Sequence, residues 1–301
     1  MSLTQPENLA KGLFFAMVGA VMFSSKAIFI KLGYAAEADY IELLFLRICV
    51  AGPVFLIIAL KTASQNKVSP ISKSQGASII GLGFLGYYLS SVFDFIGLAY
   101  ISASLERLIL YIYPTLVLIF GYFIFGRRVS VLQMLSLCLT YIGLIIVFGF
   151  QKNDLASANI LVGGLLVLGA TVSYACYVLF SGELIPKVGP VRFTALVMLV
   201  SSSFICCHYV FSKGFVFPAF DLQLYAVSAA LGVICTIFPT LLLAQAIFLI
   251  GSSNTALAGG VGPISTIFLA VIFLGESLSS IQFVGAALVL LGVSSLTFLK
   301  R

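Results

Sequence analysis

The sequence predicts an all-α integral membrane protein of ten transmembrane helices, arranged as two inverted five-helix repeats. Three observations lead to this prediction: the composition, the length of the apolar runs, and an internal repeat. Of the 301 residues, 61% are hydrophobic and 9% are charged, and the mean hydropathy is +1.18. Soluble domains contain roughly 45–50% apolar and about 25% charged residues. A soluble fold of this size could not bury so much apolar surface, so we expect the chain to lie in lipid.

Ten runs are long enough to form the helices, since about 20 mostly apolar residues cross the hydrocarbon core. They lack the alternating pattern, about ten residues long, of the strands of membrane β-barrels. Short polar segments such as Gly126-Arg127-Arg128 separate the runs. The helices expected in the first half cover residues 9–32, 40–60, 76–97, 102–125 and 131–149. Those expected in the second half cover residues 161–181, 191–212, 223–249, 254–274 and 281–299.

The basic residues predict the orientation of these helices. The first run is longer than the apolar region of a signal peptide and contains Lys26, so we interpret it as a retained helix. With the N-terminus in the cytoplasm, Lys and Arg concentrate in the inner loops and ends. We therefore expect a multi-pass protein of the plasma (inner) membrane with both termini in the cytoplasm. The inner residues are Lys11, Lys61, Lys67, Lys73, Arg127, Arg128, Lys187, Arg192, Lys300 and Arg301, and the outer ones are Lys31, Lys152 and Lys213.

The two halves of the chain match each other when one is shifted by 149 residues. The shift aligns Ser104 with Ser253, Leu108 with Leu257, Pro114 with Pro263, Gly126 with Gly275 and Gly143 with Gly292. We therefore expect two repeats, over residues 9–149 and 161–299. Because five is an odd number of helices, the second repeat must be inserted with the opposite orientation. Inverted repeats around a site near the middle of the membrane are the architecture of many secondary transporters.

Residues at matching places of both repeats also resemble a known family. One stretch runs from Ile101-Ser102-Ala103-Ser104 through Tyr113-Pro114 to Gly126, and the other from Gly262-Pro263 through Leu274-Gly275-Glu276 to Gly285-Ala286. These are similar to the signatures of the EamA family of the drug/metabolite transporter superfamily. The resemblance covers nearly the whole chain and implies ten helices, a central cavity open alternately to each side, and a small solute as cargo. The sequence departs from the family at Arg127, where an acid is usual, and at Phe23-Ser24, where Trp-Gly is often found.

Charged side chains are costly inside a bilayer, so those within the expected helices are candidate functional residues. There are five of them, and all belong to the first repeat: Lys26, Arg47, Asp94, Glu106 and Arg107. Asp94 and Arg107 either pair with each other or bind the amino and carboxylate groups of a zwitterionic substrate. Lys26, Arg47 and Glu106 are candidates for an ion network or for coupling. Lys26 and Arg47 have the alternative of snorkelling to the outer interface, and titration of Asp94 and Glu106 would couple transport to protons.

Helical spacing adds uncharged candidates for the substrate cavity. On the third helix, Tyr87 and Ser90 share a face with Asp94, and on the fourth helix Tyr111 shares a face with Arg107. In the second repeat, the candidates are Tyr174, Tyr177, Thr236 and Thr240. Pro239 predicts a kink between the two threonines, because proline leaves a backbone carbonyl without its partner.

Several other activities are disfavoured. The single histidine, His208, and six scattered cysteines do not form a metal site, and no G-x-x-x-x-G-K-[ST] loop for ATP is present. We expect no cofactor, no catalytic residues and no nucleic-acid partner. The expected partners are the transported solute and membrane lipid, and the sequence leaves open whether the protein forms a homodimer. The sequence therefore favours a secondary transporter of small metabolites, amino acids or related polar solutes above all, acting as an exporter. Two alternatives remain: a membrane enzyme on lipid-like substrates, and a membrane sensor or assembly subunit without cargo.

Overall fold

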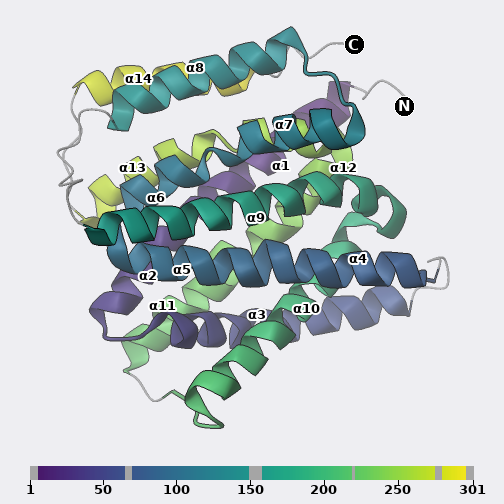
Figure 1. Ribbon diagram of the computed structural model, residues 1–301, viewed down its shortest axis with the longest axis vertical. Coiled ribbons are helices and arrows are strands. Elements are labelled where there is room, and N and C mark those ends of the chain that lie inside the picture. The colour runs from purple at the N-terminus through teal and green to yellow at the C-terminus, as the bar shows by residue number, and fades with distance from the viewer. Residues whose placement is uncertain (1–5, 65–69, 149–157, 219–220, 275–279, 296–301) are drawn as a thin grey trace.

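The computed structural model describes residues 6–64, 70–148, 158–218, 221–274 and 280–295, and these ranges contain helices and short connections only (Figure 1). The first half comprises α1 (Pro6–Ser24), α2 (Lys26–Ala35), α3 (Tyr40–Ala63), α4 (Lys73–Gly83), a π-helical turn η1 (Phe84–Leu89), α5 (Ser90–Tyr100), α6 (Ala103–Leu110), α7 (Tyr113–Phe125) and α8 (Val131–Phe148). The second half comprises α9 (Ala158–Val188), α10 (Pro190–Lys213), α11 (Leu222–Gly232), a π-helical turn η2 (Val233–Ile237), α12 (Phe238–Ala258), α13 (Val261–Leu274) and α14 (Ser280–Ser295).

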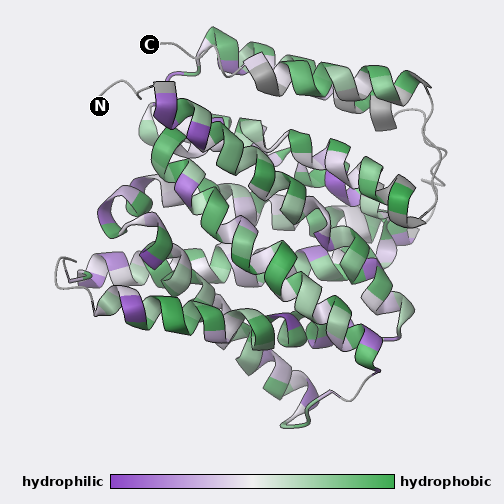
Figure 2. Ribbon diagram, turned by 180° about the vertical axis from the view of Figure 1, so that it is seen from behind, coloured by the Kyte–Doolittle hydropathy of each residue, from purple (hydrophilic) through white to green (hydrophobic). Residues whose placement is uncertain are grey.

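The helices have the length and surface that a bilayer requires. Within the described residues, seven continuous helical segments are long and apolar enough to cross a membrane, and α8 and α14 contain shorter apolar segments. Hydrophobic residues cover the helices along most of their length, and hydrophilic ones concentrate near the ends and connections (Figure 2). Large apolar side chains such as Phe123, Leu161 and Ile272 are exposed on the outside of the bundle. Such an outer surface is stable against lipid chains and not against water.

The elements of the two halves correspond in order, with α1 and α2 together matching α9, and α5 and α6 together matching α12. A shift of 149 residues carries α4 onto α11, η1 onto η2, and α8 onto α14, and a shift of 150 carries α3 onto α10. The fourth helix of each half is broken at the same place: α6 is followed by α7, and the end of α12 by α13. Helix α12 contains Gly251 at φ +79°, which divides it into the eighth expected helix and the first part of the ninth. The structure thus has the ten helical rods of the two-repeat fold.

Helices of one half pack against helices of the other. The closest pairs are α8 with α14, α1 with α12, α3 with α10, and α5 with α9, and the α8–α14 pair lies at one side of the bundle (Figure 1). The first helix of each half therefore packs on the third helix of the other, since α9 is the counterpart of α1 and α12 that of α5. This exchange places the core between the two repeats, so neither repeat buries its apolar faces alone.

Several expected helices differ from the prediction. The first helix, expected over 9–32, is divided at Ser25 into α1 and α2, and those expected over 102–125 and 254–274 are divided between α6 and α7 and between α12 and α13. Helix α9, expected over 161–181, begins at Ala158 and continues through Pro186 to Val188, and Gly189 with φ +89° ends it. The kink expected at Pro239 is a π-helical turn, in which the Thr236 hydroxyl donates a hydrogen bond of 2.7 Å to the Leu231 carbonyl. Residues 149 and 296–299 of the expected helices, and Gly275-Glu276 of the second signature, lie outside the described residues.

The α8–α14 contact depends on glycines at equivalent positions of the two repeats. A Cβ added at Gly143 would lie 2.6 Å from the Gly285 carbonyl oxygen, and one at Gly292 would lie 2.9 Å from the Ser136 carbonyl oxygen. Small residues of this kind let helix backbones approach closely in lipid, where van der Waals packing drives association.

We expect Gly143→Ala to destabilise the protein by about 1–3 kcal/mol, because the new methyl group overlaps a backbone carbonyl that cannot move aside. The measurement is the midpoint of thermal unfolding in detergent. Gly81→Ala is the matched control, since a Cβ at Gly81 meets no heavy atom within 4 Å. Equal midpoints for the two variants would contradict this account of the α8–α14 pair.

Candidate functional site

A cavity lies at the centre of the bundle, where the two repeats meet. Its walls come from α1, α2, η1, α5, α6 and α7 of the first half and from α9, α12 and α13 of the second. The volume free to water-sized molecules is about 90 Å³, below the roughly 300–1,000 Å³ of typical ligand pockets. A solute of more than a few atoms therefore requires the surrounding helices to move apart. The lining includes Phe23, Ser24, Lys26, Gly86, Tyr87, Ser90, Ser91, Asp94, Arg107, Leu110, Tyr111, Tyr113, Tyr174, Pro239, Leu243, Thr255, Gly259, Gly262 and Pro263.

The break between α1 and α2 supplies one wall of this cavity. A helix end leaves backbone carbonyls without partners, and lipid offers no water to satisfy them. Side chains do so here: the Ser25 hydroxyl donates to the Met22 carbonyl at 2.8 Å, and the Arg107 guanidinium donates to the Phe23 carbonyl at 3.1 Å. The hydroxyl of Thr266 donates to the Ser24 carbonyl at 3.4 Å. The break is thus held by α6 and α13, and it places Lys26 at the start of α2.

Lys26 and Asp94 form an ion pair at the cavity wall. The Lys26 Nζ atom donates to Asp94 Oδ2 at 2.5 Å, and the two side chains are 6% and 2% exposed. The second carboxylate oxygen, Oδ1, is buried without a hydrogen bond. Lys26 therefore reaches inward, and the snorkelling alternative is wrong for this residue.

Arg107 and Glu106 form a second buried pair on α6. The Arg107 Nε atom lies 3.1 Å from Glu106 Oε2, although the contact lacks hydrogen-bond geometry, and Glu106 is fully buried. Arg47, on α3, contacts α5: its guanidinium donates to the Ser91 hydroxyl at 3.3 Å and covers the Phe95 ring at 5.3 Å. Arg47 is also buried, so it does not snorkel either. Asp94 and Arg107 thus face different partners, and the direct pairing considered from the sequence is absent.

Tyrosines line the cavity from the second break in the fold. The Tyr111 hydroxyl donates to the Leu257 carbonyl at 3.2 Å, and the Tyr113 hydroxyl donates to the Ala256 carbonyl at 2.9 Å. These carbonyls belong to the last turn of α12, where the helix ends before α13. Gly259 allows the approach, since a Cβ there would lie 2.2 Å from the Tyr113 hydroxyl. The two rings consequently present aromatic surface to the cavity while their hydroxyls hold the helix end.

Six of the nine residues predicted to form a substrate cavity line this one: Tyr87, Ser90, Asp94, Arg107, Tyr111 and Tyr174. Lys26, expected in an ion network, lines it as well. Tyr177, Thr236 and Thr240 are not lining residues, and both threonines donate hydrogen bonds to carbonyls in and beside η2. The sequence reasoning missed Phe23, Tyr113 and Thr255. For Tyr113 and Thr255 the available signal was the shift of 149 residues, which aligns them with Gly262 and Glu106 at the two broken helices.

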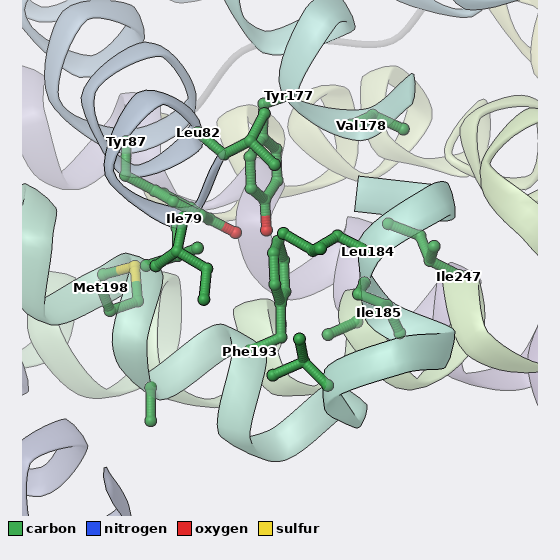
Figure 3. Packing of buried hydrophobic residues seen from close by; sticks show 14 of the residues in the cluster. Ile79, Leu82, Tyr87, Tyr177, Val178, Leu184, Ile185, Phe193, Met198 and Ile247 are labelled. Atoms are coloured by element: carbon green, nitrogen blue, oxygen red, sulfur yellow. The ribbon is translucent and has the colours of Figure 1, made fainter. Parts of the chain in front are cut away.

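An aromatic cluster separates the central cavity from a second cleft. Tyr87 packs edge to face on Tyr177, with ring centroids 4.9 Å apart, and Tyr177 stacks with Phe193. The hydroxyls of Tyr87 and Tyr177 point toward each other (Figure 3), but neither makes a hydrogen bond of standard geometry. Leu82 and Leu184 belong to the same cluster and also line the cleft between α4 and α9, whose volume is about 530 Å³. We name Tyr87, Tyr177 and Phe193 the aromatic plug.

The buried pair Lys26–Asp94 predicts strong coupling between two substitutions. Lys26→Met or Asp94→Asn alone leaves the partner charge buried and unpaired, and breaking a buried pair in this way costs about 3–5 kcal/mol. In the double variant both charges are absent, so its loss of unfolding free energy is expected to be smaller than the sum of the single losses. Thermal unfolding of the four proteins in detergent measures the difference. Additive losses would show that the two charges do not interact.

Comparison with known proteins assigns this architecture to a family. The model of the EamA-like transporter family matches the chain twice, over residues 10–149 and 161–298. The chain is 31% identical to the uncharacterized transporter YcbK of Bacillus subtilis (strain 168), over 97% of this chain and 94% of that protein. It is 26% identical to the uncharacterized transporter YyaM of the same organism, over 82% and 81% of the two chains. A solved crystal structure shares the fold with a TM-score of 0.76 and 17% identity, over 96% of this chain and 98% of that chain. The chain therefore belongs to the EamA-like transporter family and is a multi-pass membrane transporter.

Proposed function

We propose that this protein is a secondary transporter that moves small polar metabolites, amino acids or related solutes, by alternating access through the central cavity. The observation that carries this proposal is a cavity with buried charged residues between two equivalent repeats. A site between inverted repeats is reached from one side or the other when one repeat rocks against its counterpart. The small volume of the cavity is the one expected for a state of the transport cycle in which the cavity is closed to both sides of the membrane. We further propose that the termini are cytoplasmic, that the membrane is the plasma (inner) membrane, and that net movement is outward.

The cavity has two closures of different chemistry. In the proposed topology, the cleft between α4 and α9 faces the cytoplasm, and the aromatic plug closes the cavity on that side. Toward the other side lie the pairs Lys26–Asp94 and Glu106–Arg107. Tyr87 and Asp94 are separated by seven residues on the η1–α5 segment, about 10 Å at the helical rise. A solute between them would contact one closure at each end, so its binding and release can bias which closure opens.

The first test is uptake into liposomes that contain the purified protein, with a labelled panel of amino acids, nucleosides and sugars. We expect accumulation of one class, and a loss of at least about tenfold in Arg107→Ala and Asp94→Asn, because removing one partner of a buried charged contact costs about 2–5 kcal/mol. Arg128→Ala is the matched control, since Arg128 is exposed and outside the cavity. Release of the same solute from cells that express the protein tests the outward direction. Uptake of no solute by the folded protein would contradict the proposed transport function.

The aromatic plug gives a separate prediction. Among the described residues, Tyr177 is the largest fully buried side chain, and its ring lies against Gly86, where a Cβ would be 2.3 Å from Tyr177 Cγ. Tyr177→Ala removes the centre of the closure, so we expect the cavity to leak toward the cleft. The measurement is the accessibility of Ser90→Cys to a water-soluble thiol reagent added from the α4–α9 side, in a cysteine-free background. Labelling is expected to rise severalfold in Tyr177→Ala and not in the lipid-facing control Tyr122→Ala; an unchanged rate would contradict the closure.

A further inference from the structure

We propose that the central cavity selects cargo with one net negative charge, a carboxylate carried on an apolar or aromatic body. The proposal rests on the proposed transport function and narrows its substrate class: among the solutes named there, it selects organic acids over zwitterionic amino acids. Two features of the described residues carry it: the balance of buried charge around the cavity, and the side chains that form the remaining wall.

The buried charges do not cancel. The cluster contains three cations, Lys26, Arg47 and Arg107, which are 5%, 3% and 7% exposed, and two acids, Asp94 and Glu106, which are 1% and 0% exposed. The net charge is therefore +1, and protonation of either acid would only raise it. Lys31 is partly exposed and lies outside this buried cluster. Asp39 and Glu42, at the start of α3, form a separate group with Lys213; its net charge is −1, but its side chains are partly exposed, so solvent screens it.

This imbalance distinguishes ligands by their net charge. Taking charge out of water costs several kcal/mol per ion unless an opposite charge compensates it. A cationic solute would raise the total to +2, and a zwitterion would leave it at +1. A monoanion brings the total charge of the cavity and its ligand to zero. Its binding therefore removes the free-energy cost of the uncompensated positive charge that is buried in the empty site.

The hydrogen bonds around the cavity lead to the same class. Asp94, the acid that lines the cavity, already accepts a hydrogen bond of 2.5 Å from the Lys26 ammonium group. The ammonium group of a ligand would have to displace that of Lys26, which the chain holds in place. Arg107 also lines the cavity. Its Nε lies 3.1 Å from Glu106 Oε2 and one terminal nitrogen donates to the Phe23 carbonyl, so the other terminal nitrogen has no partner among the described residues. A guanidinium N–H binds a carboxylate through a charge-assisted hydrogen bond. The carboxylate oxygens that make no hydrogen bond, Asp94 Oδ1 and both oxygens of Glu106, are buried. The wall therefore offers a donor to an acid, whereas the acceptors for an amine are paired with Lys26 or buried.

The rest of the wall fits an apolar body. The aromatic rings of Phe23, Tyr111, Tyr113 and Tyr174 surround the cavity, and Leu110 and Leu243 complete its apolar part. Tyr111 and Tyr113 use their hydroxyls on helix carbonyls. Their ring surfaces are what remains for a ligand, and such surfaces bury apolar area against flat or aliphatic groups.

The test compares three ligands that share a phenylethyl body and differ in charge: 3-phenylpropionate (−1), phenylalanine (zwitterion) and phenethylamine (+1). Binding to the purified protein is measured by displacement of labelled 3-phenylpropionate at pH 7, and each ligand is assayed for exchange across liposomes. We expect 3-phenylpropionate to bind at least tenfold more tightly than the other two. Arg107→Gln should abolish this preference. Arg47 does not itself line the cavity, although it donates to the lining residue Ser91. Arg47→Met makes the cluster neutral, so the ratio of the affinities for 3-phenylpropionate and phenylalanine should fall toward one.

The opposite results separate this inference from the proposed function. Tighter or equal binding of phenylalanine or phenethylamine by the unaltered protein would overturn the charge selectivity, and exchange of that ligand across liposomes would leave transport standing. Failure of all three ligands, with uptake of another solute, would likewise overturn the inference alone. The comparison of ligands requires no variant, so a substitution that prevents folding does not remove the test.

Discussion

The satisfaction of backbone carbonyls inside the bilayer is the constraint on which the rest of this structure depends. The chain breaks its helices at Ser25 and after Ala258, in the middle of the membrane-spanning bundle, and each break leaves carbonyls that water cannot reach. Arg107 holds the first break through the Phe23 carbonyl, and Tyr111 and Tyr113 hold the second through Leu257 and Ala256. All three residues also line the cavity. The side chains that make the broken helices stable are therefore the ones available to a solute, and a change of helix position must exchange these bonds for others.

The two repeats contribute unequally to this site, although their backbones correspond. In the second repeat, neutral residues replace every buried charge of the first: Cys176 is the counterpart of Lys26, Val197 of Arg47, Leu243 of Asp94, Thr255 of Glu106 and Ala256 of Arg107. The plug is asymmetric too, since Tyr87 corresponds to Thr236 and Tyr177 to Ala27. Duplication thus supplies a scaffold whose fourth helix is broken at the same place in both halves, whereas the break at Ser25 has no counterpart in α9. Divergence of side chains makes one side of the cavity charged and the other aromatic.

Membrane solvation explains why the fold could be predicted so far from the sequence. A spanning helix must satisfy its backbone internally and cover its outside with apolar residues, which gives each run a length and a composition that can be recognised directly. The family and the two-repeat fold followed from these runs and from the Pro and Gly positions that repeat at 149 residues. The positions at which helices end or break were harder to predict from the sequence. Ser25 in an apolar run carries no strong signal for a break, because the residues that stabilise it lie on α6 and α13.

The sequence by itself determined the all-helical architecture, the repeat, and the short list of charged residues from which a site could be built, because the cost of charge in lipid makes each of them conspicuous. Only the tertiary structure decided how those charges are partnered. Lys26 was a candidate for an ion network, with snorkelling to the interface as the alternative, and it pairs with Asp94, 68 positions further along the chain. Tyr177 had been expected in the cavity, yet it lies behind Tyr87 in the plug. Pairing across helices depends on how the helices are rotated and how closely they approach, and these are set by packing between the two repeats, which no single segment encodes.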